Sequence, residues 1–180
     1  MMKRTTTRLG FKSKLKYLYN YIFLSDRRSY IIPCNTPLIL ISQIQRSGGT
    51  LLSQLFDDHS HLFTHPHELH WGHPNKWDWP NFDAEALRDP VRLWKRLKSS
   101  FIDKAIVKGY QKGSYSNRLP FHFDRLQQWR IFKEGIEEGA SSQREVFDRY
   151  MTAFFNGWLD YQNLYRTPKR YTVAFTPRVN

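Results

Sequence analysis

Five residues could together hold an anion at the point where an apolar run gives way to a helical pattern. They are Arg46, Ser47, Gly48, Gly49 and Thr50. Glycine lets the backbone adopt turn angles that other residues resist and approach a ligand closely. Unpaired N–H groups at a helix start favour a phosphate, the guanidinium adds a permanent charge with forked donors, and the two hydroxyls add further hydrogen bonds. These residue types predict a site for a phosphate-like group. A plain strand-to-helix connection is the alternative.

Two other phosphate-binding loops do not fit this segment. The nucleoside triphosphatase loop, G-x-x-x-x-G-K-[ST], uses a lysine for the phosphates and a hydroxyl for Mg²⁺, but no lysine follows Gly48 and Gly49. The dinucleotide pattern G-x-G-x-x-G is not matched either. An ATP-dependent kinase is therefore kept only as a third hypothesis.

Histidines form the second group of residues that could do chemistry. Six of the seven lie between His59 and His73. Within residues 67–70 two histidines stand three apart, whereas the zinc protease motif needs them four apart on one helix, and Pro66 and Pro74 argue against a helix there. We therefore expect no metal site. The histidines are expected to bond within a loop or to line an anionic acceptor pocket.

The elements around these residues predict an α/β fold. Residues 38–41 are a continuous apolar run with β-branched side chains, which predicts a buried strand of a parallel sheet covered on both faces. Residues 50–56 carry leucines at helical spacing, and residues 60–64 read as a short second strand. Residues 65–80, rich in Trp, His and Pro, are expected to form an irregular functional loop.

The second half of the chain is predicted to be mostly helical. Helices are expected at residues 84–98, 124–138 and 143–165, and a third strand at residues 171–175. Apolar residues of the last helix step by three and four, which predicts a core-facing side. They are Phe147, Tyr150, Met151, Phe154, Trp158, Tyr161 and Tyr165. The element order predicts an α/β domain with a parallel sheet flanked by helices.

At residues 45–52 the sequence resembles the sulfotransferases that use 3′-phosphoadenosine 5′-phosphosulfate. Their signature is close to "PRSGTTLL", which here reads "QRSGGTLL". Gln45 replaces the usual proline. Gly49 replaces a threonine. This replacement removes one hydroxyl contact but keeps the backbone N–H. The similarity continues through "LFDDHSHLFTHPHELH", and "FFNGWLDYQNLY" also looks like a bacterial branch of the family. The resemblance implies a P-loop-like sheet.

The resemblance also implies roles for the glycine segment. Arg46, Ser47, Gly48, Gly49 and Thr50 would cradle the 5′-phosphosulfate of 3′-phosphoadenosine 5′-phosphosulfate, which would be a co-substrate. Arg46 would stabilise the charge that grows on the bridging oxygen during transfer of the sulfuryl group. No metal is expected to take part.

The family's general base follows the second strand, which points to Glu68, with His67 as the second choice. The base must take the proton of an acceptor hydroxyl, for which a saccharide is the family analogy. Burial beside Trp71 and the histidines would have to raise the pKa of a carboxylate for this role.

The family's 3′-phosphate site lies after a later buried strand, in an "RDP"-like context. Residues 88–90 read Arg-Asp-Pro, but the residues before them read as a helix, so we interpret the match as coincidental. We expect the chain to be a fragment that carries the first part of the enzyme, with doubtful activity if its sheet is truncated. A truncated sheet would leave residues 171–175 as an exposed edge.

Positive charge is concentrated at the start of the chain. Lysine and arginine total 28 against 16 acidic residues, and the first 30 residues hold eight of the bases and one acid. We interpret residues 1–33 as a basic arm with an amphipathic helix, and residues 34–180 as the sulfotransferase-like domain. The alternative to the enzyme is a non-catalytic remnant or module whose arm binds anionic lipid or polymer. No nucleic-acid partner is expected, and a solvated tail is the simplest reading of the arm.

Compartment signals are few. The single cysteine, Cys34, allows no disulfide within the chain and is expected to be structural. The apolar stretch at residues 17–24 is shorter than the roughly 20 residues of a membrane-spanning helix, and no small-residue cleavage site follows it. We expect a cytoplasmic protein, with peripheral membrane contact through the arm.

Overall fold

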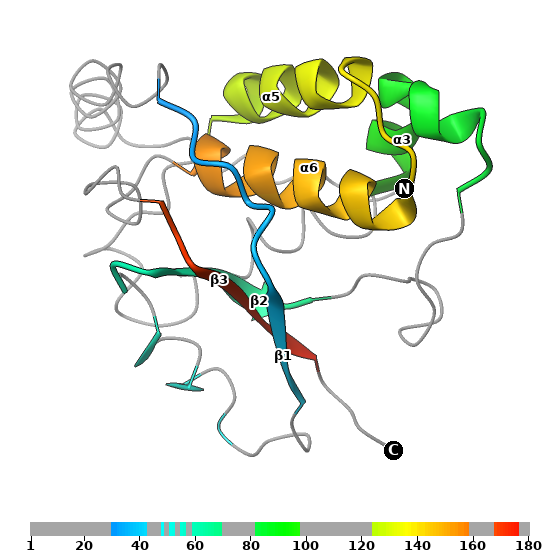
Figure 1. Cartoon of the computed structure of the whole chain (residues 1–180). Helices are drawn as coiled ribbons and strands as arrows, with labels where there is room; N and C mark the ends of the chain where they lie inside the picture. Colours follow the sequence, from blue (N-terminus) through cyan, green and yellow to red (C-terminus); the bar gives the residue numbers. More distant parts are fainter. Residues whose placement is uncertain are drawn as a thin grey trace, which may run out of the picture.

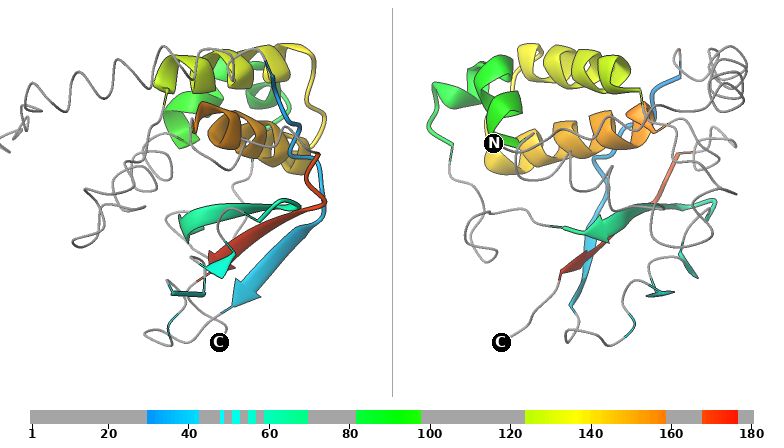
Figure 2. Two further views of the ribbon diagram at one scale, coloured as in Figure 1. Left: turned by 90° about the vertical axis from the view of Figure 1, so that its left-hand side faces the viewer. Right: turned by 180° about the vertical axis from the view of Figure 1, so that it is seen from behind.

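The chain folds into a parallel sheet with helices stacked over one face. The computed structural model describes residues 30–42, 48, 51–52, 55–56, 59–69, 82–97, 124–158 and 168–176. In this part, helix α6 (Gln143–Gly157) lies between the sheet and helix α5 (Arg125–Glu137), as Figures 1 and 2 show from three sides. The predicted α/β class with a parallel sheet is confirmed at this level.

Within the described residues the sheet contains three strands, β1 (Leu38–Ser42), β2 (Leu62–Glu68) and β3 (Tyr171–Thr176), in the order β1-β3-β2. Both pairings are parallel. β2 begins two residues later than predicted and runs four residues further, so residues 65–68 belong to the strand and not to an irregular loop. The pairing register shifts between Thr64 and Glu68. Pro66 lies in this interval and has no N–H to donate to the ladder.

Two predictions about strand position are wrong. β3 is not an edge, because it lies between β1 and β2, and residues 172–175 are buried. β1 is not covered on both faces, because Ile39 and Leu40 are 41% and 48% exposed. Both errors have one cause: the last strand in the sequence inserts between the first two, which leaves β1 at an edge of the described sheet.

Capping residues set the start of the two long helices. The Asp124 side chain accepts hydrogen bonds from the backbone N–H groups of Leu126 and Gln127 at the start of α5. Ser142 accepts from the backbone N–H of Glu145 at the start of α6, while the Glu145 carboxylate accepts from the backbone N–H of Ser141 at 2.8 Å. The Asp124 and Ser142 side chains satisfy N–H groups that the first helical turn leaves unpaired, and the Glu145 carboxylate holds the residue before the cap. The starts agree with the sequence prediction.

Two helices differ in extent from the prediction. The helix expected at residues 84–98 is split into a short 3₁₀ turn, η2 (Ala86–Arg88), and α3 (Pro90–Leu97). Pro90 cannot continue a preceding helix but suits the first helical position of the next one. α6 ends at Gly157, eight residues earlier than predicted, because Trp158 is extended with φ −86° and ψ 102°.

The buried side of α6 forms the centre of the hydrophobic core. The predicted core residues Phe147, Tyr150, Met151, Phe154 and Trp158 are all at most 1% exposed. The other two, at positions 161 and 165, lie outside the described residues.

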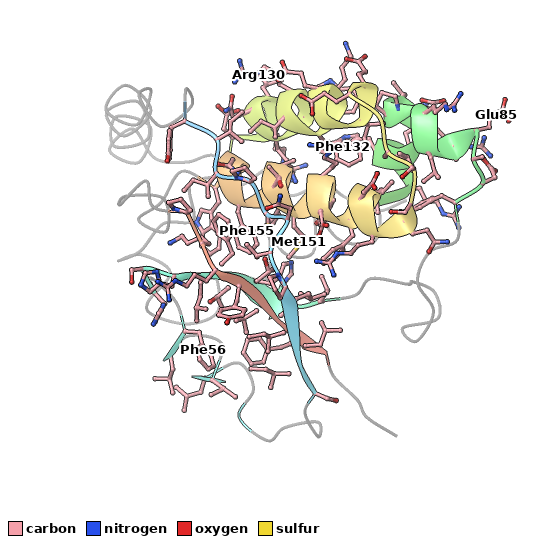
Figure 3. The ribbon with its side chains drawn as sticks, viewed as in Figure 1. Phe56, Glu85, Arg130, Phe132, Met151 and Phe155 are labelled. Atoms are coloured by element: carbon pink, nitrogen blue, oxygen red, sulfur yellow. The ribbon has the colours of Figure 1, made fainter. Side chains whose placement is uncertain are left out.

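Aromatic contacts tie the helices to the sheet. Phe155 of α6 stacks on Phe63 of β2, with ring centroids 4.5 Å apart, and Figure 3 shows it between the helix and the sheet. Phe56 packs against Phe175 from another side, at 6.4 Å between centroids, and its carbonyl accepts a hydrogen bond from the Thr64 hydroxyl. Stacked and tilted pairs of this kind add to the free energy gained by burying the rings.

Residues 30–36, here called the strap, run across α6 before entering β1 (Figure 1). The Asn156 side chain accepts from the backbone N–H of Ile32 and donates to its carbonyl, both at 2.8 Å. One helical turn earlier, the Thr152 hydroxyl accepts from the backbone N–H of Cys34 at 2.8 Å. Ile32, which the sequence places in the arm, is thereby part of the core.

Candidate functional site

The carboxyl ends of the three strands lie at one edge of the sheet because all three run parallel. At this edge Ser42 of β1 pairs with Thr176 of β3, and Glu68 of β2 pairs with Phe175. Neighbouring strands lie about 4.8 Å apart, so the backbones of Ser42 and Glu68, on either side of β3, are about 10 Å apart. Ligands of open α/β sheets bind outside this edge. We call it the carboxyl edge.

Gly48, in the segment that leaves β1, has the backbone conformation that a glycine turn requires. Its φ is +86°, a region that residues with a Cβ rarely adopt. Its carbonyl accepts a hydrogen bond from the Leu52 N–H at 3.0 Å, and Leu51 and Leu52 are helical. A helical turn therefore begins at Gly48, and the start of a helix generally leaves N–H groups without a partner inside the helix.

An added Cβ at Gly48 would meet no atom within 4 Å. The requirement for glycine at this position therefore comes from the backbone angle and not from a steric limit on a side chain. Arg46, Ser47, Gly49 and Thr50 lie outside the described residues. The anion cradle stays a prediction for these four, and Gly48 is the one member whose conformation can be compared with it.

The two candidate bases lie on the last residues of β2. The backbones of His67 and Glu68 are part of the strand, and the next residue, Leu69, donates its N–H to the Phe175 carbonyl at 2.7 Å. The side chains of His67 and Glu68 lie outside the described part. The fold brings the backbone of the expected base to the carboxyl edge, and its role stays a prediction.

The predicted histidine cluster is divided along β2. His59 and His61 are exposed before the strand begins, and the N–H of His61 donates to Nδ1 of His59 at 3.1 Å. His65 is buried inside the strand, where its ring stacks on Phe154 with centroids 5.2 Å apart. His65 is therefore a core residue and not part of a loop, because β2 continues through it. Among the described residues, no three side chains of His, Cys, Asp or Glu are grouped as metal ligands.

Lys169, just before β3, is a buried cation that the sequence pattern did not single out. It is 5% exposed, and its Nζ donates to the His59 carbonyl at 3.2 Å. The same ammonium lies 5.6 Å from the centre of the Phe63 ring, within range of a cation–π interaction. The burial of Lys169 follows from contacts with His59 and Phe63, which lie more than a hundred residues earlier in the sequence. No local spacing in the sequence could therefore have predicted it.

Burial makes Cys34 a poor nucleophile. Its thiol contacts the Thr172 hydroxyl at 2.9 Å, and burial raises the pKa of the thiol to about 12. A thiolate, which is the reactive form, is therefore disfavoured at neutral pH. The structural role expected for Cys34 agrees with this environment.

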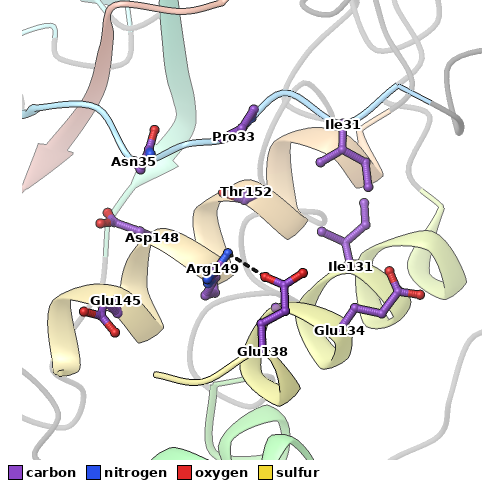
Figure 4. A pocket seen from close by; sticks show the side chains of 11 residues that line it. Ile31, Pro33, Asn35, Ile131, Glu134, Glu138, Glu145, Asp148, Arg149 and Thr152 are labelled. Atoms are coloured by element: carbon purple, nitrogen blue, oxygen red, sulfur yellow. Dashed lines mark ion pairs between the residues drawn. The ribbon is translucent and has the colours of Figure 1, made fainter. Parts of the chain in front are cut away.

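A pocket lies where the strap crosses α5 and α6 (Figure 4). Asp148 of α6 lines it and pairs with Arg144 at 2.9 Å. Partial burial raises the pKa of the Asp148 carboxyl, while hydrogen bonds from Ser141 lower that of Glu145, which also lines the pocket. Sequence reasoning missed this pocket, because it depends on residues more than a hundred positions apart.

No helix in the described part of the chain is both long and apolar enough to cross a membrane. Comparison with protein-family models finds no match, and neither the curated proteins nor the solved structures contain a significant relative of this chain.

Proposed function

We propose that the carboxyl edge binds 3′-phosphoadenosine 5′-phosphosulfate, as the phosphosulfate-binding part of a sulfotransferase with a P-loop-like sheet. The observation that carries the proposal is the pairing of Ser42 and Glu68 with the end of β3. This pairing puts the backbone of Ser42, which lies four residues before Arg46 in the sequence, about 10 Å from the backbone of the expected base. The positive φ of Gly48 at the start of a helical turn supports it further.

In the proposed reaction, Glu68 takes the proton from an acceptor hydroxyl, with His67 as the second candidate. The hydroxyl oxygen attacks sulfur in line and forms a new S–O bond. The bond from sulfur to the bridging phosphate oxygen breaks, and 3′-phosphoadenosine 5′-phosphate leaves with that electron pair. Arg46 and the amides of residues 47–50 stabilise the negative charge on the bridging oxygen. A saccharide hydroxyl is the proposed acceptor class.

Isothermal titration of the full chain with 3′-phosphoadenosine 5′-phosphate tests the proposal. Arg46→Ala removes charge-assisted hydrogen bonds worth about 1.5–3 kcal/mol each, so affinity should fall roughly 10- to 150-fold. Arg88→Ala is the matched control, because Arg88 is an exposed arginine of η2 in the sequence Arg-Asp-Pro. It should leave the affinity unchanged. Equal affinities of the wild type and Arg46→Ala would refute the site.

Gly48→Ala and Gly139→Ala separate loss of binding from loss of stability. Both glycines have positive φ, +86° and +110°, and a Cβ at either would meet no atom within 4 Å. Each substitution should therefore cost a similar free energy of unfolding, about 1–2 kcal/mol. Only Gly48→Ala should weaken nucleotide binding. Equal loss of binding in both variants would mean that the effect is one of stability.

A further inference from the structure

The pocket at the strap has a size suited to a side chain or a small ligand. Its volume is about 350 Å³, within the range of ligand pockets. It is lined by the strap, α5 and α6 through Ile31, Pro33, Asn35, Ile131, Glu134, Gly135, Glu138, Glu145, Asp148, Arg149 and Thr152. Figure 4 shows the carboxylates of α5 and α6 around a space closed on one side by the strap. We call it the strap pocket.

Alternation along the strap explains the apolar part of the lining. Ile31 and Pro33 line the pocket, whereas Ile32 and Cys34 are buried on the other side. This is the period of two of an extended chain, held in place by Asn156 and Thr152. Ile131 of α5 adds a third apolar side chain to the lining. This surface suits the aliphatic stem of a long side chain.

The charged part of the lining is negative, in contrast to the chain as a whole. Among the described residues of the lining, four carboxylates face one guanidinium, that of Arg149, which pairs with Glu138 at 3.2 Å. Asp148 pairs with Arg144, whose side chain is not part of the lining. Glu134 forms no ion pair with any described residue. A cation with an apolar stem complements both parts of the lining.

The chain itself carries such cations a few residues before the strap in the sequence. Arg27 and Arg28 stand four and three residues before Ile31, so their Cα atoms lie at most about 14 and 11 Å from its Cα. They end the basic arm, in which eight bases accompany one acid over the first 30 residues. A tethered cation has an effective concentration of the order of millimolar, which favours it over a free ligand.

We propose that the strap pocket docks the basic end of the chain's own N-terminal arm, through Arg27 and Arg28. The guanidinium groups face Glu134 and the neighbouring carboxylates, and the stems lie along Ile31 and Ile131. Docking holds part of the arm's positive charge against the domain. The arm is then less available to an anionic surface, and salt releases it, because partly exposed charges are screened over about 8 Å at physiological ionic strength. The inference does not depend on the proposed nucleotide site.

Limited trypsin digestion of the full chain tests the docking, since trypsin cleaves after Arg27 and Arg28. Glu134→Lys replaces attraction by repulsion at the pocket and should speed cleavage at these two bonds about three- to tenfold. Glu137→Lys is the matched control: it makes the same charge change on α5 but lies outside the lining. It should leave the cleavage rate unchanged. Far-UV circular dichroism and the melting temperature of each variant report whether it is folded.

A charge swap and a salt series complete the test. Arg28→Glu combined with Glu134→Lys should be cleaved after Arg27 more slowly than Arg28→Glu alone, because the pair is restored with reversed signs. Rising NaCl should bring the wild-type rate up to that of Glu134→Lys. Equal rates in the wild type and Glu134→Lys, or protection that grows with protein concentration and so indicates a second copy's arm, would overturn the proposal.

Discussion

Removing the Asn156 side chain should detach the strap from α6. Asn156 is 3% exposed and bonds both backbone groups of Ile32, whose own exposure is 2%. Asn156→Ala leaves that N–H and that carbonyl without partners. A buried unsatisfied group costs about 1–3 kcal/mol, or roughly 2–6 kcal/mol for two. Because Ile31 and Pro33 on either side are exposed, water can reach part of the gap, and we expect about 2–4 kcal/mol.

Urea unfolding of the full chain measures this cost. The midpoint should fall while the slope stays unchanged, since the area exposed on unfolding is nearly the same. The melting temperature should fall by roughly 4–16 °C, at about 2–4 °C per kcal/mol for a chain of this size. Asn35→Ala is the control, because Asn35 is an exposed strap residue, and it should cost less than about 0.5 kcal/mol. If Asn156→Ala lowered the free energy of unfolding no more than the control does, the proposed role of Asn156 in holding the strap on α6 would be refuted.

Three further changes address other parts of the described structure. Burial raises the pKa of the Cys34 thiol from 9.0 to about 12, so in a labelling experiment at pH 8 the thiol should react with a thiol reagent only as fast as the protein opens. The free energy of unfolding should also fall more steeply between pH 9 and 12 in the wild type than in Cys34→Ala, as pH-dependent unfolding would show. Burial raises the pKa of the Asp148 carboxyl in the folded state, so ionisation of this group destabilises the fold as pH rises above 3.8. The free energy of unfolding of Asp148→Asn, relative to that of the wild type, should therefore increase from pH 3 to 7 in urea unfolding. Phe155→Ala removes a ring stacked on Phe63 and should cost about 3–5 kcal/mol in the same assay, whereas Leu126→Ala, at an 80% exposed position, should cost little.

Local sequence signals predicted the elements better than their placement. The starts of α5 and α6 depend on local contacts, since Asp124 and Ser142 cap N–H groups two or three residues further on, and the core face of α6 follows from a regular spacing. The position of β3 between β1 and β2 depends on pairing across more than a hundred residues, which no local pattern encodes. The end of α6 at Gly157 was missed because the apolar spacing continues to residue 165.

The candidate site shows the same division. The glycine turn was predicted from residue types, and the positive φ of Gly48 agrees with it. The pairing of Glu68 with the end of β3 depends on the sheet, and sequence reasoning reached Glu68 only through the family resemblance. The strap pocket was missed entirely, because its carboxylates belong to exposed faces of two helices that only the tertiary fold brings to Ile31.

An NMR titration of the full chain with 3′-phosphoadenosine 5′-phosphate tests the central claim most directly. If the segment after β1 presents its amides to the nucleotide, the largest ¹H–¹⁵N shift changes should fall on residues 46–50, with Gly48 among them. The same amides should not respond in Arg46→Ala at equal ligand concentration. Unchanged Gly48 and neighbouring amides at a saturating nucleotide concentration would contradict the account.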